Sequence, residues 1–252
     1  MDLVEYVLLA LAAAVAGAIN AVAGGGSLVS FPALVAVGYP AKVANITNTV
    51  ALWPGYVGGS FGYAAQLSGQ RRRVLVLTIP SILGALVGSA ILLYTPESSF
   101  EAIVPFLILF AAALMALQTR LAAFVARHRP ERKDADANVE VLLAIFALAI
   151  YGAYFGAGLG ILTLAVLGIL LPDDLHRSNA LKGLLSAIIN AAAVVYFAIW
   201  GPVEWVPAAV MAVAALAGGY YGVGLARKLS PKYLRAVVIA YAVVVAVVIL
   251  VR

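Results

Sequence analysis

The feature that most constrains this chain is a succession of ten apolar segments, separated by short stretches of charge, glycine and proline. Several of them approach the ~20 residues that a helix needs to cross about 30 Å of hydrocarbon, and the alternating ten-residue pattern of a membrane β-barrel is missing. Hydrophobic residues make up 65% of the chain and the mean hydropathy is +1.07. We therefore predict an all-α integral membrane protein within a lipid bilayer. The predicted segments are 3–23, 27–38, 43–63, 74–94, 102–126, 139–155, 159–171, 178–200, 205–226 and 234–251.

Composition removes several classes of function. The chain has no cysteine, which excludes disulfides and thiolate metal sites, and the sequence implies no cofactor and no metal. The net charge of +5 does not indicate nucleic-acid binding, because the basic residues lie in short loops between apolar segments. Asp2 and Glu5 stand where a signal peptide carries basic residues, so we expect the first segment to be retained as a span.

The basic residues also predict an orientation. If all ten segments cross and the N-terminus is outside, 14 of the 16 Lys and Arg residues fall in cytoplasmic connections, leaving only Lys42 and Arg252 outside. Because positive charge favours the cytoplasmic side, we expect both termini to lie outside a bacterial inner membrane.

The two halves of the chain are predicted to be inverted repeats. The charged connection 127–138 divides the chain into 1–126 and 139–252, with five segments in each. Because five is odd, the second set starts from the opposite face of the membrane. A constant offset of 134 residues supports the division. It matches Gly24 with Gly158, Gly26 with Gly160, Asn45 with Asn179, Asn48 with Lys182, Gly84 with Gly218 and Gly88 with Gly222.

Segments 27–38 and 159–171 are too short to cross the membrane, reaching about 18–20 Å at 1.5 Å per residue. One end of each must lie inside, at the glycine motifs 23–27 and 156–160. Two helix N-termini would then converge at the midplane and form an anion site. The alternative is that these glycines only allow close packing. We expect that packing role for the pairs Gly84/Gly88 and Gly218/Gly222, within one chain or between two copies in a homodimer.

The helix after each short segment carries polar residues on one face. The spacing of four polar residues places them on a single helical face: Asn179, Lys182, Ser186 and Asn190. Lys182 is the only charged side chain between Asn179 and Ala198. The alternative for Lys182 is a lysine that snorkels to the cytoplasmic surface. The predicted substrate-binding residues are Gly24, Gly25, Gly26, Ser27, Asn45, Asn48, Thr49, Gly158, Gly160, Asn179, Lys182 and Ser186.

All eleven carboxylates and both histidines lie in loops or near segment ends, so no buried proton relay is evident. An exported anion needs none, because a cell-negative potential drives each negative charge outward by ~2.3 kcal/mol per 100 mV.

The stretches "AVAGGGSLVSFPALVAVGYPAKVANITNTVALWPG" and "FGAGLGILTLAVLGILLPDDLHRSNALKGLL" resemble the sulfite exporter TauE/SafE family of membrane permeases, and the resemblance covers essentially the whole chain. It implies a transporter, not an enzyme, for sulfite or a related small sulfur oxyanion or organosulfonate. The residues named above would then line the substrate path. Leu159 and Ile161 depart from the denser run of small residues that this family would lead us to expect.

Three functions are compared. The first is an exporter that works by alternating access around a midplane site. The second is an anion channel, or an uptake permease for organosulfonates, using the same residues. The third and most remote is an intramembrane hydrolase with Ser27 or Ser186 as nucleophile; Ser186 could pair with Lys182, four residues away on one helix face.

Overall fold

The computed structural model describes residues 2–22, 25–61, 67, 69–127, 138–171, 175–226 and 231–251. These residues form ten α-helices and no strands, which confirms the all-α fold class, and each predicted segment corresponds to one helix. Gly24 and residues 128–137 of the predicted linker lie outside the described residues. The helices are α1 (Leu3–Val22), α2 (Ser27–Ala36), α3 (Ala41–Phe61), α4 (Arg71–Tyr94), α5 (Glu97–Arg127), α6 (Val139–Tyr154), α7 (Leu159–Leu170), α8 (Leu175–Trp200), α9 (Trp205–Ala226) and α10 (Pro231–Val251).

Helix lengths fall into the two groups that the sequence predicts. Helices α1, α4, α5 and α8 are long and apolar enough to cross a membrane. Helices α2 and α7 have only 10 and 12 residues, or about 15 and 18 Å at 1.5 Å per residue. Both short helices follow a glycine-rich break, so the prediction of broken helices is confirmed.

Some helices begin earlier than predicted. Helix α4 starts at Arg71 instead of residue 74, and α5 starts at Glu97 instead of residue 102. The predicted boundaries followed hydrophobicity, whereas a helix continues past the apolar core as long as its first turn can be solvated. A carboxylate such as Glu97 in the first turn also interacts favourably with the positive end of the helix dipole.

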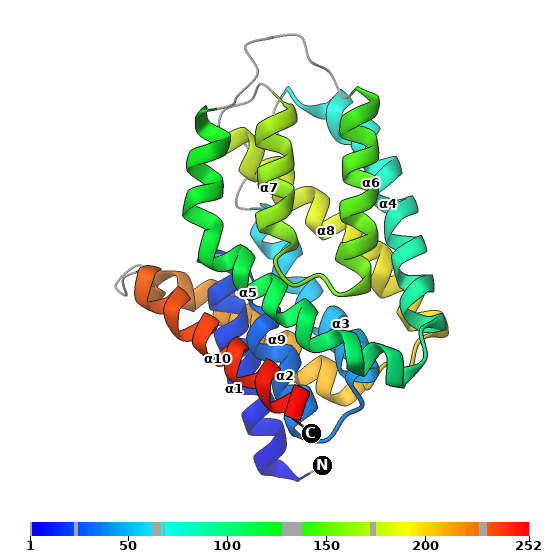
Figure 1. Cartoon of the computed structure of the whole chain (residues 1–252), viewed down its shortest axis with the longest axis vertical. Helices are drawn as coiled ribbons and strands as arrows, with labels where there is room; N and C mark the ends of the chain where they lie inside the picture. Colours follow the sequence, from blue (N-terminus) through cyan, green and yellow to red (C-terminus); the bar gives the residue numbers. More distant parts are fainter. Residues whose placement is uncertain are drawn as a thin grey trace.

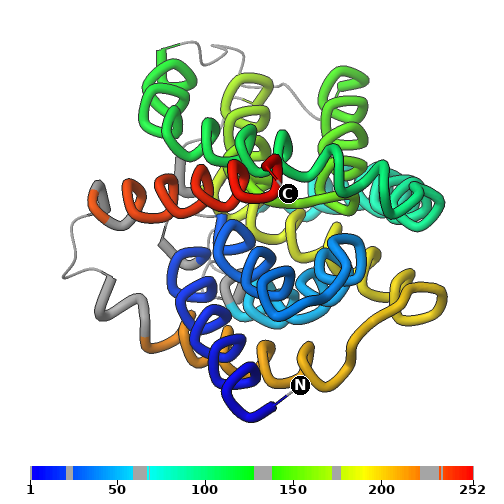
Figure 2. Tube along the Cα trace, turned by 60° about the horizontal axis from the view of Figure 1, so that its bottom comes forward, coloured from blue at the N-terminus to red at the C-terminus, as the bar shows by residue number. Residues whose placement is uncertain are grey.

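The helices pack into two units that differ from the two halves of the sequence (Figure 1). The upper unit in that view contains α4, α6, α7 and α8, the lower unit contains α1, α2, α3 and α9, and α5 and α10 pack mainly against each other. The most extensive packing is inside the units, with α1 against α9 and α4 against α6. Among the described residues, the substantial contact between the two units is that of α3 with α8, and Figure 2 shows α5 and α10 side by side.

In the two helix pairs with the most extensive packing, glycines bring the two backbones into direct contact. A Cβ on Gly218 of α9 would overlap the carbonyl oxygen of Ala14 of α1. A Cβ on Gly88 of α4 would likewise overlap the carbonyl oxygen of Ile150 of α6. Gly84 packs against Phe146 in the same way, so the glycine contacts described for Gly84, Gly88 and Gly218 are made within this chain. Small residues at these positions let the helices interlock where lipid offers no hydrophobic drive for association.

These pairings have a simple relation to the predicted repeat. If α1 to α5 correspond to α6 to α10, then the pair α1–α9 corresponds to α6–α4, and α3–α9 corresponds to α8–α4. Replacing each helix by its counterpart in the other half therefore turns one of these helix pairs into the other. The inverted repeat itself remains a prediction.

The glycine contact at Gly218 generates a stability prediction. Gly218→Val should lower the free energy of unfolding by about 1–3 kcal/mol or more, because its side chain has no space against α1. The measurement is the thermal unfolding midpoint of the purified protein in detergent. Gly55→Ala is the matched control, since a Cβ on this helical glycine meets nothing within 4 Å. Equal midpoints for the two variants would contradict the close α1–α9 contact.

Candidate functional site

The first helix break, between α1 and α2, is held by side chains from two helices. Gly25 has φ 96°, a left-handed conformation that favours glycine. The backbone N–H of Gly26 donates to Oδ1 of Asn20 at 2.7 Å. The hydroxyl of Tyr56 on α3 is hydrogen-bonded to the side chains of Ser27 and Asn20. The break is therefore a fixed structural element whose freed polar groups find partners inside the protein.

The second break, between α6 and α7, is held in a similar way. Gly156 and Gly158 have φ values of 76° and 79°. The hydroxyl of Tyr151 donates to the carbonyl oxygen of Ala157. Nδ2 of Asn45 on α3 donates to the carbonyl oxygen of Tyr154 at 2.8 Å. Asn45, predicted as a ligand, thus satisfies a carbonyl at the end of α6, which has no further partner in its own helix.

The two breaks meet around α5. A Cβ on Gly25 would touch the side chain of Met115, and a Cβ on Gly158 would lie 3.2 Å from Cδ1 of Leu114, the neighbouring residue. The rings of Phe31 and Phe155, just beyond the breaks, pack edge to face with centroids 5.6 Å apart. The breaks therefore converge, as the sequence suggests.

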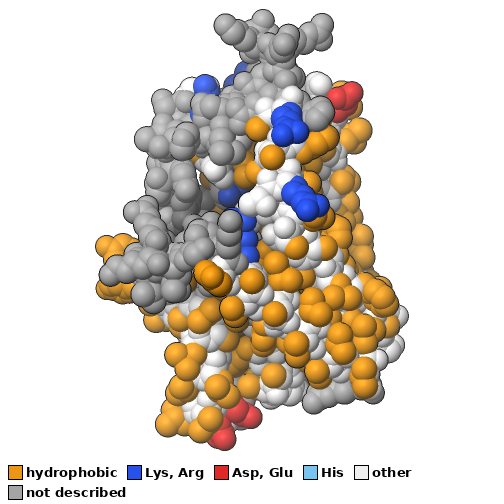
Figure 3. Space-filling model, turned by 60° about the vertical axis from the view of Figure 1, so that its left-hand side comes forward, with side chains coloured by type: hydrophobic (Ala, Val, Ile, Leu, Met, Phe, Trp, Pro, Cys, Tyr) orange, Lys and Arg blue, Asp and Glu red, His pale blue; other side chains and the backbone are white. Residues whose placement is uncertain are grey.

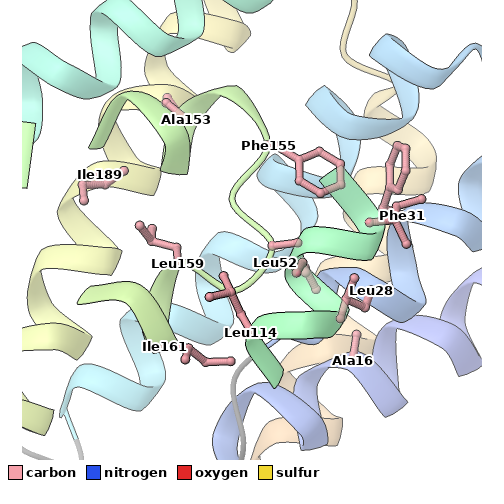
Figure 4. Packing of buried hydrophobic residues seen from close by; sticks show 14 of the residues in the cluster. Ala16, Leu28, Phe31, Leu52, Leu114, Ala153, Phe155, Leu159, Ile161 and Ile189 are labelled. Atoms are coloured by element: carbon pink, nitrogen blue, oxygen red, sulfur yellow. The ribbon is translucent and has the colours of Figure 1, made fainter. Parts of the chain in front are cut away.

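The space between the breaks is filled by apolar side chains, which the sequence analysis did not anticipate. Figure 4 shows Leu114 between Leu28 on one side and Leu159 and Ile161 on the other. Leu28, Leu159 and Ile161 are buried, and so is Leu52 of α3. Sequence reasoning considered only the four helices next to the breaks and omitted α5, whose residues 111–115 insert here. The described side chains between the two helix N-termini are therefore apolar, where the sequence suggests a polar site.

Lys182 lies beside the second break. Its Nζ donates to Oδ1 of Asn179, one turn away, at 3.0 Å. Its Cδ would lie 3.8 Å from a Cβ on Gly160, so the stem of the lysine runs along the first turn of α7. Lys182, Asn179 and Gly160 are all half-buried. We name these three residues the α8 cluster. The structure thus brings together three of the predicted residues around one ammonium group.

Ser186 lies one turn further along α8 and is buried, and its Oγ has no hydrogen-bond partner in the structure. Asn190 donates back to the carbonyl oxygen of Ser186 at 2.8 Å. Asn190 is therefore engaged with its own helix. The Ser186–Lys182 pair of the hydrolase alternative is not formed, because the Ser186 hydroxyl has no partner and Lys182 donates to Asn179.

The predicted residues of the first half form a second, sealed group. Asn45, Asn48 and Thr49 on α3, which we name the α3 cluster, are 2%, 2% and 8% exposed. The hydroxyl of Thr49 donates to the carbonyl oxygen of Asn45 in its own helix at 3.0 Å. Oδ1 of Asn48 is buried and has no hydrogen-bond partner among the described residues. The predicted site residues thus divide into a sealed cluster on α3 and a half-exposed cluster on α8.

The two clusters lie on opposite sides of the crossing between α3 and α8. Nε1 of Trp53 donates to the carbonyl oxygen of Ala187 at 3.2 Å, and these two residues are also separated by 134 positions. The two helices start at opposite ends of α4. Lys42 contacts the carbonyl oxygens of Leu93 and Thr95 at one end, and Gln70 donates to Arg177 at the other. Asn48 and Lys182 each lie five residues before the crossing, or about 7.5 Å along each helix.

Sequence reasoning missed three residues that hold the breaks: Asn20, Tyr56 and Tyr151. Asn20 and Tyr151 are polar side chains in the last turns of the helices that precede the two glycine motifs. Tyr56 lies on the same face of α3 as Asn45 and Asn48. A search for polar side chains within two turns of each glycine motif would have found all but Tyr56.

The fold and these two breaks define a multi-pass helical membrane protein with paired broken helices, an arrangement typical of transporters. Sequence comparison then gives the family: the chain belongs to the sulfite exporter TauE/SafE family, whose model matches residues 9–249. This is a membrane transporter family, and membrane transport is the function that it assigns.

Curated relatives are described as transporters without a named substrate. The chain is 26% identical to the probable membrane transporter protein ORF9 of Sinorhizobium sp., over 98% of this chain and 93% of that protein. It is 27% identical to a probable membrane transporter protein of Haemophilus influenzae, over 82% of this chain and 80% of the relative. It is 24% identical to the probable membrane transporter protein YfcA of Escherichia coli, over 90% and 82% of the two chains.

The bond from Asn45 to the second break generates a second prediction. Asn45→Leu should lower the free energy of unfolding by about 1–3 kcal/mol, because the carbonyl of Tyr154 loses its partner in a buried place. Thr49→Val is the matched control, since the hydroxyl that it removes is bonded only within α3. Thermal unfolding in detergent measures the stability of both variants. If Thr49→Val lowered the stability as much as Asn45→Leu or more, the role assigned to Asn45 would be contradicted.

Proposed function

We propose that this transporter exports sulfite, or a related small sulfur oxyanion or organosulfonate, across a bacterial inner membrane by alternating access. The observation that carries the proposal is the position of Lys182. The residue is half-buried, its stem lies beside the first turn of α7, and the described partner of its ammonium group is the neutral side chain of Asn179. No described carboxylate pairs with it, so an anion would supply the missing counter-charge.

The surroundings of Lys182 suit a small oxyanion. Gly160 lies in the first turn of α7, at the positive end of the helix dipole, where the N–H groups of Leu159, Ile161 and Leu162 donate to the carbonyl oxygens of Gly156 and Gly158. The amide of Asn179 adds a neutral polar group, and the lysine adds one full positive charge. A sulfite or sulfonate group, with three oxygens on one sulfur, can accept hydrogen bonds from the amide and the ammonium at once.

The direction of entry follows from accessibility and charge. The starts of α4 and α6 and the ends of α5 and α7 lie at the end of the molecule opposite to both termini (Figure 1). Arg71, Arg72, Arg73 and Arg127 lie at that end. In Figure 3 the visible Lys and Arg side chains lie in the upper half, while the lower half is mostly hydrophobic with acidic side chains at its tip. We assign the upper end to the cytoplasm.

The α3 cluster is buried and the α8 cluster is half-buried on the other side of the α3–α8 crossing, and we infer that the α8 cluster opens toward the cytoplasm. A cytoplasmic anion could therefore reach Lys182 while the path beyond it is closed by apolar side chains. The membrane potential would then favour release outside once the protein rearranges. Closure at the centre favours a carrier over a permanently open anion channel. Uptake of organosulfonates would use the same site with the opposite net flux.

The proposal predicts that the charge of Lys182 is required. In proteoliposomes, Lys182→Met should reduce sulfite flux to the background level, whereas Lys182→Arg should retain part of it, because the cation remains near Asn179. The control is Arg120→Gln, which removes an exposed cation from α5. Full transport by folded Lys182→Met would contradict the site. Unitary current steps in planar bilayers would favour the channel instead.

A further inference from the structure

We propose that Leu114 and Met115 of α5 form the gate of the transport path, and we call this pair the gate. The inference rests on the alternating-access function proposed above. It names the two side chains that must withdraw before an anion can pass from Lys182 to the other side of the protein. Figure 1 shows α5 crossing the middle of the molecule just below the loop that joins α6 to α7. Among the described residues, this helix packs chiefly against α10 and also contacts α7, α3 and α2, so it reaches both short helices.

The first argument is that neighbouring residues of α5 occupy the two breaks. Cε of Met115 lies 2.5 Å from the place of a Cβ on Gly25, and Cδ1 of Leu114 lies 3.2 Å from the place of a Cβ on Gly158. Successive residues are about 100° apart around a helix, so the two side chains leave α5 in different directions, one toward each break. Ala111, one turn before Leu114, also approaches Gly158. A single turn of α5 therefore contacts the starts of both short helices.

The second argument is that this fit depends on the glycines. Gly25 and Gly158 have left-handed φ values of 96° and 79°, which favour glycine. A side chain on Gly25 would collide with Met115, so the missing side chain is what admits the methionine. Met115 is 1% exposed and Leu114 is 9% exposed. Both side chains of the gate are thus packed against the breaks and do not face lipid.

The third argument concerns what a charged substrate would meet at the gate. Leu28, Leu159 and Ile161 surround it, and all three are buried (Figure 4). Moving an anion from water into apolar surroundings without a partner is strongly unfavourable, and an apolar constriction also excludes water. An anion held at Lys182 therefore stays on its own side until the gate withdraws. The unbranched side chain of methionine, with three rotatable bonds, is suited to such a change.

The fourth argument is that the gate comes from one half of the chain only. The repeat offset of 134 residues matches Leu114 with Val248 of α10, and Met115 with Ile249. Val248 is 47% exposed and Ile249 is only partly buried, so α10 does not insert the equivalent pair into the protein. The insertion of α5 is therefore not imposed by the plan that the two halves are predicted to share. For this reason we assign the pair to function and not to the scaffold.

The experiment measures how fast a membrane-impermeant maleimide labels Asn48→Cys in inside-out membrane vesicles. The chain has no cysteine, so this thiol is the only one, and at a position that is 2% exposed it should react slowly. Adding Leu114→Ala should raise the labelling rate at least about tenfold, because the shortened side chain lets water between the breaks. Leu114→Met, which keeps the apolar volume, should leave labelling slow.

Ile108→Ala is the matched control. It removes as many carbon atoms as Leu114→Ala from another buried residue of α5, six positions away, or about 9 Å along the helix. An unchanged labelling rate in folded Leu114→Ala, or an equal increase in Ile108→Ala, would overturn the gate. Rapid labelling of Asn48→Cys with Leu114 in place would do so as well.

Two further points keep the test decisive. If Leu114→Ala does not fold, Leu114→Val and Ile108→Val take the place of the alanine pair, since each removes a single carbon atom, and the same outcomes decide. Labelling requires no transport, so it is independent of the proposed function. If the unmodified protein moves no sulfite in proteoliposomes, the proposed function fails, and the labelling rates still decide whether Leu114 closes the path.

Discussion

The structure depends on the need to satisfy a broken backbone in an apolar interior. Each helix break leaves N–H and carbonyl groups that no water in the bilayer core can bind. At the first break Asn20 accepts from the N–H of Gly26 and is itself held by Tyr56, and at the second break Tyr151 and Asn45 donate to backbone carbonyls. Because α3 contributes to both, it holds the two breaks in a fixed relation. The short helices α2 and α7 can therefore start deep inside the protein.

On this shared scaffold the two halves differ in one charge and in access. Asn48 and Lys182 are matched in sequence and lie at equal distances from the crossing of α3 and α8, yet one is buried and neutral while the other is half-exposed and cationic. The two matched positions thus differ in charge and in burial, and the site proposed at Lys182 lies on one side of the crossing only.

The sequence predicted the fold class, the ten helices, the two short helices and the family, because hydrophobic length and glycine motifs are local signals. It also placed Asn179, Lys182 and Gly160 together, since one helical face and a repeat offset are enough for that. It could not predict that Leu114 and Met115 of α5 fill the space between the breaks, because they look like any other apolar residues of a span. Nor could it predict that α1 packs against α9 and α4 against α6, since that depends on which glycine stripe meets which helix.

The most direct test of the account is the accessibility of two single cysteines in inside-out membrane vesicles. A Cβ on Gly160 meets only Cδ of Lys182, at 3.8 Å, so Gly160→Cys places a thiol beside the ammonium group, while Asn48→Cys places one at the matched, sealed position. A membrane-impermeant maleimide should label Gly160→Cys and not Asn48→Cys. Sulfoacetate, used because sulfite consumes maleimide, should slow the labelling of Gly160→Cys. Equal labelling of both cysteines, or labelling of Gly160→Cys that no sulfonate or sulfate slows, would contradict an anion site at Lys182 that opens to the cytoplasm.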